Sequence, residues 1–269
     1  AAFQVTRDLS IGAGISYYYS ELVNKRQIDF GSILGMPGAM DGSFRSSGYG
    51  DGWGYNLGVL YRPGRRHSFG LTFRSGSDIS YRGNARISSI PPPLSPVSEL
   101  SSRFSTEIDL PPTATLAYAF RATPDLTLEI DINWTGWKTF RELEMDFDSD
   151  TPLFADQTIK KNWHNAMFYS LGAEYSITDP LVVRAGVGFM ESPIPEETFD
   201  TMVVRTKQYA ASLGAGYRAG DLSVDLALLG AFGENRRIEN TVGNEVGADL
   251  DGTYRNDNYL ASLSGNYRF

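Results

Sequence analysis

A strict alternation of large apolar residues with small or polar residues constrains the fold of this chain more than any other feature. From Trp53 to Tyr61, every second residue is large and apolar, and Gly54, Asn56 and Gly58 fall between them. A period of two places these two kinds of residue on opposite faces of a β-strand. The alternation recurs at 9–19, 69–73, 114–120, 126–134, 167–175, 181–189, 209–217, 222–228 and 259–269. The sequence therefore predicts a single all-β domain over residues 1–269, built from ten antiparallel, up-and-down strands.

The connections between the predicted strands have two lengths. Four are tight turns at 62–65, 122–125, 178–180 and 219–221. They contain proline, which presets φ, glycine, which tolerates positive φ, and aspartate, which hydrogen-bonds its own backbone. The other connections are long, at about 31–50, 88–103, 148–160, 192–201 and 240–252. Short turns at one end and long loops at the other are typical of barrels in the bacterial outer membrane.

The alternation alone fits a soluble sandwich or propeller as well as a transmembrane β-barrel, because both have two-faced strands. Aromatic residues near the strand ends favour the barrel, since such rings gather at membrane–water interfaces. The last strand carries Tyr267 and Phe269, a pattern that resembles the assembly signal of outer-membrane proteins. We therefore predict that the apolar face meets lipid and that the charged face lines a lumen.

The predicted lumen face carries charges of both signs, and we expect these charges to neutralise one another rather than to bind substrate. The residues are Arg74, Arg121, Glu129, Asp131, Glu174, Arg184, Arg218, Asp225 and Arg268.

Composition argues against several other functions. The formal net charge of −8 disfavours nucleic-acid binding, which requires a basic stripe. The chain has no cysteine and only two histidines, His67 and His164, so we predict no catalytic residue, no metal site and no cofactor. No run of about 18 apolar residues occurs, so no transmembrane helix is predicted.

Several runs, taken in order, resemble a known family. They are LPPTATLAYAF at 110–120, LTLEIDINWTGW at 126–137, YSLGAEY at 169–175 followed by Thr178-Asp179, and RAG at 184–186 followed by ESPIP at 191–195. The set is similar to the FadL/TodX (OMPP1) family, outer-membrane transporters of long-chain fatty acids and other hydrophobic compounds. The similarity runs from about Asp8 to Phe269.

The resemblance implies a fourteen-stranded barrel whose lumen is plugged by an N-terminal hatch. Because only ten strands are predicted, the chain looks like the C-terminal portion of such a barrel, lacking the hatch and the first strands. A ten-stranded piece could close on itself, stay open or be part of a larger barrel, and the sequence leaves these alternatives open.

The resemblance also implies that the first two long loops form an outer hydrophobic groove that captures the ligand. Both loops are rich in apolar residues, and apolar side chains exposed to water indicate packing or binding. The alternative is that these side chains only pack against one another. The predicted ligand-binding residues are Ile33, Leu34, Met36, Met40, Phe44, Ile90, Leu94, Val97 and Leu100.

We therefore predict a monomeric, non-enzymatic protein of the bacterial outer membrane that takes up long-chain fatty acids or other hydrophobic molecules passively. Besides this ligand, the expected partners are outer-membrane lipid, lipopolysaccharide and the barrel assembly machinery. Two alternatives remain: a structural or adhesive barrel without a transport role, and a lipid-modifying barrel enzyme that would need His67 or His164.

Overall fold

The structure is a computed structural model, and it describes residues 1–36, 38, 40–149, 151–242 and 250–268. Its strands are β1 (Ala2–Gln4), β2 (Leu9–Asp29), β3 (Asp41–Tyr61), β4 (His67–Arg74), β5 (Ser77–Ser88), β6 (Glu99–Leu110), β7 (Thr113–Arg121), β8 (Leu126–Thr135), β9 (Glu142–Phe147), β10 (Gln157–Lys160), β11 (Ala166–Thr178), β12 (Leu181–Met190), β13 (Gln208–Ala219), β14 (Leu222–Gly233), β15 (Arg236–Ile238), β16 (Gly252–Tyr254) and β17 (Asn258–Tyr267). Two short helical segments are α1 (Phe30–Ile33) and η1 (Trp137–Thr139). Within the described residues, neither segment approaches the length of an apolar membrane span.

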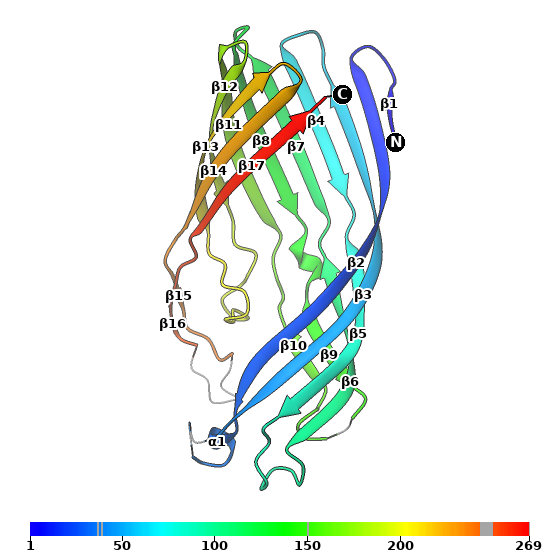
Figure 1. The fold of residues 1–269 in the computed structure, drawn as a ribbon, viewed down its shortest axis with the longest axis vertical. Helices are drawn as coiled ribbons and strands as arrows, with labels where there is room; N and C mark the ends of the chain where they lie inside the picture. Colours follow the sequence, from blue (N-terminus) through cyan, green and yellow to red (C-terminus); the bar gives the residue numbers. More distant parts are fainter. Residues whose placement is uncertain (37, 39, 150, 243–249, 269) are drawn as a thin grey trace.

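Fifteen strands form one antiparallel sheet, whose path runs β10-β9-β6-β5-β3-β4-β7-β8-β11-β12-β13-β14-β17 while β2 pairs with β3 and β1. Its strands wrap around a common axis, with the short turns at one end and the long connections at the other (Figure 1). The predicted asymmetry of the connections is therefore confirmed. The described residues of all ten predicted segments lie in strands, namely β2, β3, β4, β7, β8, β11, β12, β13, β14 and β17, apart from Arg268.

The register carries the apolar face from strand to strand. Leu71 of β4 pairs with Val59 of β3 and with Leu116 of β7. The same row then continues through Ile132, Tyr169, Phe189, Tyr209 and Phe232. The side chains of Leu71 and Leu116 are half exposed, so this row lies on the outside of the sheet. An unbroken apolar band is what the predicted lipid-facing surface requires.

The described sheet does not close on itself. Strand β17 pairs only with β14, and β10 pairs only with β9, within the part of the chain that the structure describes. The predicted barrel is thus seen as an open, curved sheet. The structure also divides the chain into more strands than the ten that we predicted.

The predicted long loops are shorter than expected, because strands extend into them. The loop predicted at 31–50 ends at Asp41, where β3 begins, and the loop predicted at 88–103 ends at Glu99, where β6 begins. Strands β5 and β9 and the end of β2 were likewise not predicted. Their outward residues, such as Arg82 and Arg103, are polar and exposed, so large apolar residues do not mark them as membrane strands do.

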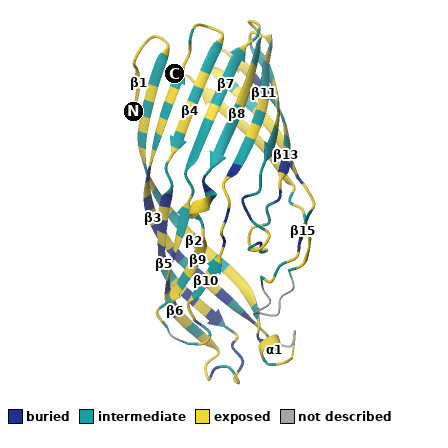
Figure 2. Cartoon of the chain, turned by 180° about the vertical axis from the view of Figure 1, so that it is seen from behind, coloured by how far each residue is buried: buried dark blue, intermediate teal, exposed yellow. Residues whose placement is uncertain are grey.

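Buried residues gather in β3, β5 and β6 at the long-loop end, whereas β4 and β7 at the short-turn end consist of intermediate and exposed residues (Figure 2). The main buried cluster contains Phe30, Phe44, Ala85, Ile87, Ile90, Phe104 and Phe154. A second cluster contains Trp163, Ile194, Phe199 and Ile238. The hydrophobic core of the described chain therefore lies toward the long-loop end.

Candidate functional site

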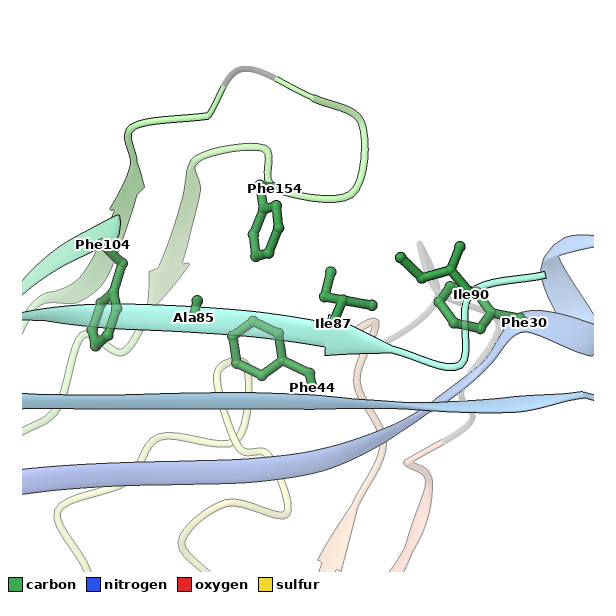
Figure 3. Packing of buried hydrophobic residues seen from close by; sticks show 7 residues of the cluster. All are labelled: Phe30, Phe44, Ala85, Ile87, Ile90, Phe104 and Phe154. Carbon is green, nitrogen blue, oxygen red and sulfur yellow. The ribbon is translucent and has the colours of Figure 1, made fainter. Parts of the chain in front are cut away.

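The main buried cluster joins the two loops that were predicted to capture ligand. Phe30 starts the first loop and Ile90 lies in the second, and both side chains are at most 3% exposed in the same cluster (Figure 3). The first loop is shaped by Asp29, whose Oδ1 accepts a hydrogen bond from the Ser32 backbone N–H (2.9 Å) and whose Oδ2 accepts one from the Ser32 hydroxyl (2.6 Å). These hydrogen bonds lower the pKa of Asp29. The two loops are thus packed against each other on a folded base.

The nine predicted ligand-binding residues separate into two groups in the structure. Phe44 and Ile90 are buried in the cluster, and Leu94 and Leu100 pack against it half-buried. Phe44 and Leu100 also lie in strands β3 and β6 rather than in loops. Exposed side chains are found instead at Ile33 (60%), Met36 (50%) and Val97 (49%). Leu34 and Met40 are intermediate.

A cationic pocket of about 370 Å³ adjoins the cluster at β2 and β3. The Arg26 guanidinium in this pocket lies over the Phe44 ring, 4.7 Å from the ring centroid. This is a cation–π geometry. Burial lowers the pKa of Arg26. The lining residues are Lys25, Arg26, Gln27, Ser43, Phe44 and Arg45, which include three cations and no carboxylate. Arg26 pairs with Phe44 and shares its face of the sheet, whereas Lys25 and Arg45 pair on the opposite face, so Arg26 is the cation of this pocket that adjoins the cluster.

The predicted lumen charges lie on the face opposite the apolar band. In β12, Arg184 pairs in register with Glu174 of β11, and its Nε donates to Glu174 Oε2 at 2.7 Å. Its Nη1 donates to Asp225 Oδ1 at 2.8 Å, across the intervening strand β13. Arg184 therefore neutralises carboxylates from two other strands.

Glycine on β13 makes this second contact possible. Gly216 lies between Val182 of β12 and Asp225 of β14 in the register. A Cβ at this position would overlap Asp225 Oδ1 and would come within 3.1 Å of Arg184 Nη1. The missing side chain thus leaves room for the ion pair, which the sequence prediction did not anticipate.

The other predicted lumen charges are distributed more widely. Glu129 and Asp131 line the same cavity as Arg184, a concave space of about 500 Å³ against β8, β11, β12, β13 and β14. By alternation, Arg74, Arg121 and Arg218 share this inner face, and Arg268 follows the end of β17; no salt bridge among the described residues includes any of the four. The structure thus brings together five of the nine predicted charges.

The second cluster, which sequence reasoning missed, is built mainly from connections, and among its four buried residues Ile238 alone lies in a strand, the short β15. Trp163 packs against Trp137 and Phe140, with ring centroids 4.9 and 5.1 Å away. Next to it, the buried Lys161 ammonium forms a salt bridge with Asp200 at 2.5 Å. The clustered residues are isolated within polar stretches, so no periodic pattern indicates them. The one local signal in the sequence is the PIP run at 193–195, which contains Ile194.

The remaining sequence-predicted positions are placed as follows. Tyr267 ends β17 opposite Leu222, and Phe269 lies outside the described residues. The His67 Nδ1 lies 2.9 Å from the Tyr118 hydroxyl, and its ring stacks on that of Phe120. Within the described chain, neither histidine ring has a serine or carboxylate hydrogen-bond partner of the kind that a hydrolase triad requires.

Comparisons with known proteins agree with this architecture. A sequence model of the family described as outer membrane protein transport protein (OMPP1/FadL/TodX) matches residues 1–269. The chain is 24% identical over 196 residues to the long-chain fatty acid transport protein of Escherichia coli strain K12, covering 70% of this chain and 43% of that protein. It is 25% identical over 234 residues to a 47 kDa outer membrane protein of Pasteurella multocida, covering 82% of this chain and 51% of that protein. The chain thus spans about half the length, or less, of these relatives.

Two solved structures share the fold. A FadL homologue of Pseudomonas aeruginosa superimposes with a TM-score of 0.84 at 22% identity, covering 99% of this chain and 66% of that one. The toluene transporter TodX of Pseudomonas putida superimposes with a TM-score of 0.68 at 19% identity, covering 100% and 67% of the two chains. With the family match over the whole chain, the relatives place the protein in the outer membrane. The chain belongs to the OMPP1/FadL/TodX family of outer-membrane transport proteins.

Proposed function

We propose that this chain takes part in the passive uptake of long-chain fatty acids or other hydrophobic small molecules, and that the two packed loops at the long-loop end capture the ligand. The named relatives support this class of ligand, since they include a long-chain fatty acid transport protein and a toluene transporter. The observation that carries the proposal is the exposure of Ile33, Met36 and Val97 on a folded apolar base. Burial of apolar surface would drive capture, at about 25 cal/mol per Å².

The division of the nine predicted residues supports separate roles for them. Phe44 and Ile90 stabilise the base, because they are already buried without ligand. The three exposed side chains are free to contact a ligand, and methionine adapts its shape to varied apolar partners. Capture by the loop tips and packing beneath them are therefore compatible, rather than alternatives.

The cationic pocket favours an amphipathic ligand such as a fatty acid. A carboxylate near Arg26 would gain a charge-assisted hydrogen bond, while its hydrocarbon chain would lie on the loops. An uncharged hydrocarbon such as toluene would gain nothing from the pocket. Arg26→Met is expected to weaken oleate binding several-fold and to leave toluene binding unchanged.

The capture site is tested with labelled oleate on the purified protein and on cells that express it. Each of the three tip residues is roughly half exposed, so covering it contributes about half of the 1.5–3 kcal/mol expected for full burial. The variant with serine at Ile33, Met36 and Val97 should therefore lose about 2–4 kcal/mol, or about 30-fold to several hundred-fold in affinity.

The matched control places serine at Met202 and Val203, which are 60% and 43% exposed in another connection. Control binding should equal that of the wild type. If the tip variant binds and takes up oleate as well as the control does, these loops are not the capture site. If the wild type itself binds and transports no hydrophobic probe, a structural role replaces the transport role. Lipid, lipopolysaccharide, assembly partners and a monomeric state remain predictions.

A further inference from the structure

Four arginines gather in two neighbouring turns at the short-turn end. Arg7 lies in the turn between β1 and β2, and Arg62, Arg65 and Arg66 lie in the turn between β3 and β4. The Arg62 backbone N–H donates to the Asp8 carbonyl at 2.7 Å, which holds the two turns side by side. All four side chains are exposed, and Asp8 is the one acidic residue within 5–8 and 62–66. Four arginines and one aspartate give this patch a formal charge of +3, although the whole chain carries −8.

These arginines adjoin a cluster of outward aromatic rings. Tyr61 precedes Arg62 and stacks on Phe69, with ring centroids 6.3 Å apart. Phe69 in turn lies 4.9 Å from Tyr118. His67, which follows Arg66, stacks its ring on those of Tyr118 and Phe120 in β7. Amphipathic aromatic rings of this kind lie at the boundary between hydrocarbon and water. The turn arginines therefore lie at the depth of lipid headgroups.

The charge of the patch is not balanced within the described chain. None of the salt bridges between described residues includes Arg7, Arg62, Arg65 or Arg66. Three exposed arginines at the long-loop end, in contrast, have carboxylate partners: Arg86 pairs with Glu99, Arg103 with Asp148, and Arg255 with Asp257. The other short turns at 178–180 and 219–221 carry aspartate instead. The positive charge is thus local to one sector of this end.

We propose that this arginine patch binds the phosphate groups of anionic phospholipids in the leaflet at the short-turn end. Guanidinium groups are attracted to phosphate chiefly by their charge, and charge-assisted hydrogen bonds add to this attraction. Phospholipid phosphates are present at high local concentration at the depth set by the neighbouring aromatic rings. An acidic protein partner would not require this depth, so the observations favour lipid. The patch would fix the height and tilt of this sector in the membrane.

The test compares lipid binding by the purified protein in detergent, using native mass spectrometry with phosphatidylglycerol and phosphatidylcholine. The wild type is expected to retain phosphatidylglycerol preferentially, and the preference should weaken at high salt. One arginine near an anionic surface contributes about fivefold, equivalent to about 1 kcal/mol. Replacing all four by glutamine should therefore reduce the preference at least tenfold.

Two further variants make the result specific. Replacement of the four residues by lysine keeps the charge but loses the paired hydrogen bonds, so it should keep most of the preference and fall only several-fold below the wild type. A control variant changes four exposed arginines elsewhere to glutamine and should keep the full preference. Its positions are Arg82, Arg86, Arg103 and Arg237.

Three outcomes would overturn the proposal. The wild type could show no preference for phosphatidylglycerol. The glutamine variant could keep the preference, even if it lost binding to an acidic polypeptide such as polyglutamate, which would mean that the patch faces a protein. The lysine variant could fall together with the glutamine variant, which would mean that positive charge is not the cause.

Discussion

Gly216 provides a sharp test of the lumen geometry. Its replacement by alanine places a Cβ where Asp225 Oδ1 now lies and therefore pushes this carboxylate away from Arg184. Gly172 is a matched control, because it also faces the lumen but its nearest neighbour to an added Cβ is the Ala185 carbonyl at 3.9 Å. The two substitutions have the same chemistry and differ only in the space around them.

The expected sizes follow from these surroundings. Arg184 and Asp225 are 43% and 36% exposed, so solvent screening limits their salt bridge to about 0.2–1 kcal/mol. Overpacking adds a cost of about 1 kcal/mol. Replacing glycine by alanine at an unstrained position recovers about 0.4–1 kcal/mol from the unfolded state. Gly216→Ala should thus destabilise the protein by about 1 kcal/mol, whereas Gly172→Ala should be neutral or stabilising by up to about 1 kcal/mol.

Urea unfolding in lipid vesicles, followed by tryptophan fluorescence, measures both changes. Repeating Gly216→Ala in an Asp225→Ala background should recover part of the loss, because the overlapping carboxylate is gone. The recovery is expected to be partial, since the Val182 Cγ2 also lies 2.9 Å from the added Cβ. Equal effects of the two glycine substitutions, or no recovery in the double variant, would refute the proposed arrangement.

Three further predictions concern the connections and the histidines. Asp200→Ala leaves the buried Lys161 ammonium without its carboxylate and should destabilise the protein by about 3 kcal/mol, measured by urea unfolding; a Lys161→Met, Asp200→Leu double variant that fared no better would contradict this reasoning. The lowered pKa of Asp29 means that its stabilising effect on the first loop is present above the ordinary carboxyl pKa, about 3.9, and is lost as the pH falls through the lower folded value. Pepsin cleavage at 30–36 should therefore rise at the acid end of its range, and it should not depend on pH in this way in Asp29→Asn. Replacing His67 and His164 together by alanine should leave oleate uptake unchanged, whereas loss of a lipid-modifying activity in this variant would favour the enzyme alternative.

The sequence predicted the membrane-facing strands well because lipid selects large apolar residues at every second position. Beyond this band, water meets both sides of the connections and the outer face of strands such as β6, so Arg103 and Ser105 alternate with Phe104 without an obvious strand pattern. The strand extensions, which shorten the predicted long loops, were missed for this reason. Polar strands are specified by their register with a neighbour, which one sequence does not reveal.

The candidate sites show the same limit. Alternation predicted that Arg184, Glu174 and Asp225 share a face, but their pairing depends on the register and on Gly216 between them. Composition indicated apolar loops but could not separate the buried Phe44 from the exposed residues at the loop tips. Pairings between distant connections, such as Lys161 with Asp200, carry no local signal at all.

The interruptions between β4 and β5, β6 and β7, β8 and β9, and β10 and β11 have a mechanical consequence. They are neighbours in space: the Gly136 N–H donates to the Pro112 carbonyl at 2.9 Å, and the Lys161 N–H donates to the Arg141 carbonyl at 2.7 Å. Pro111 and Pro112 cannot donate to the hydrogen-bond ladder, so bending along this line breaks fewer hydrogen bonds than bending elsewhere. The wall is therefore most compliant along a seam between its two ends. Strands β2 and β3 stay paired across this line, so the seam ends at β3, and the compliant part of the wall is the one that carries β5, β6, β9 and β10.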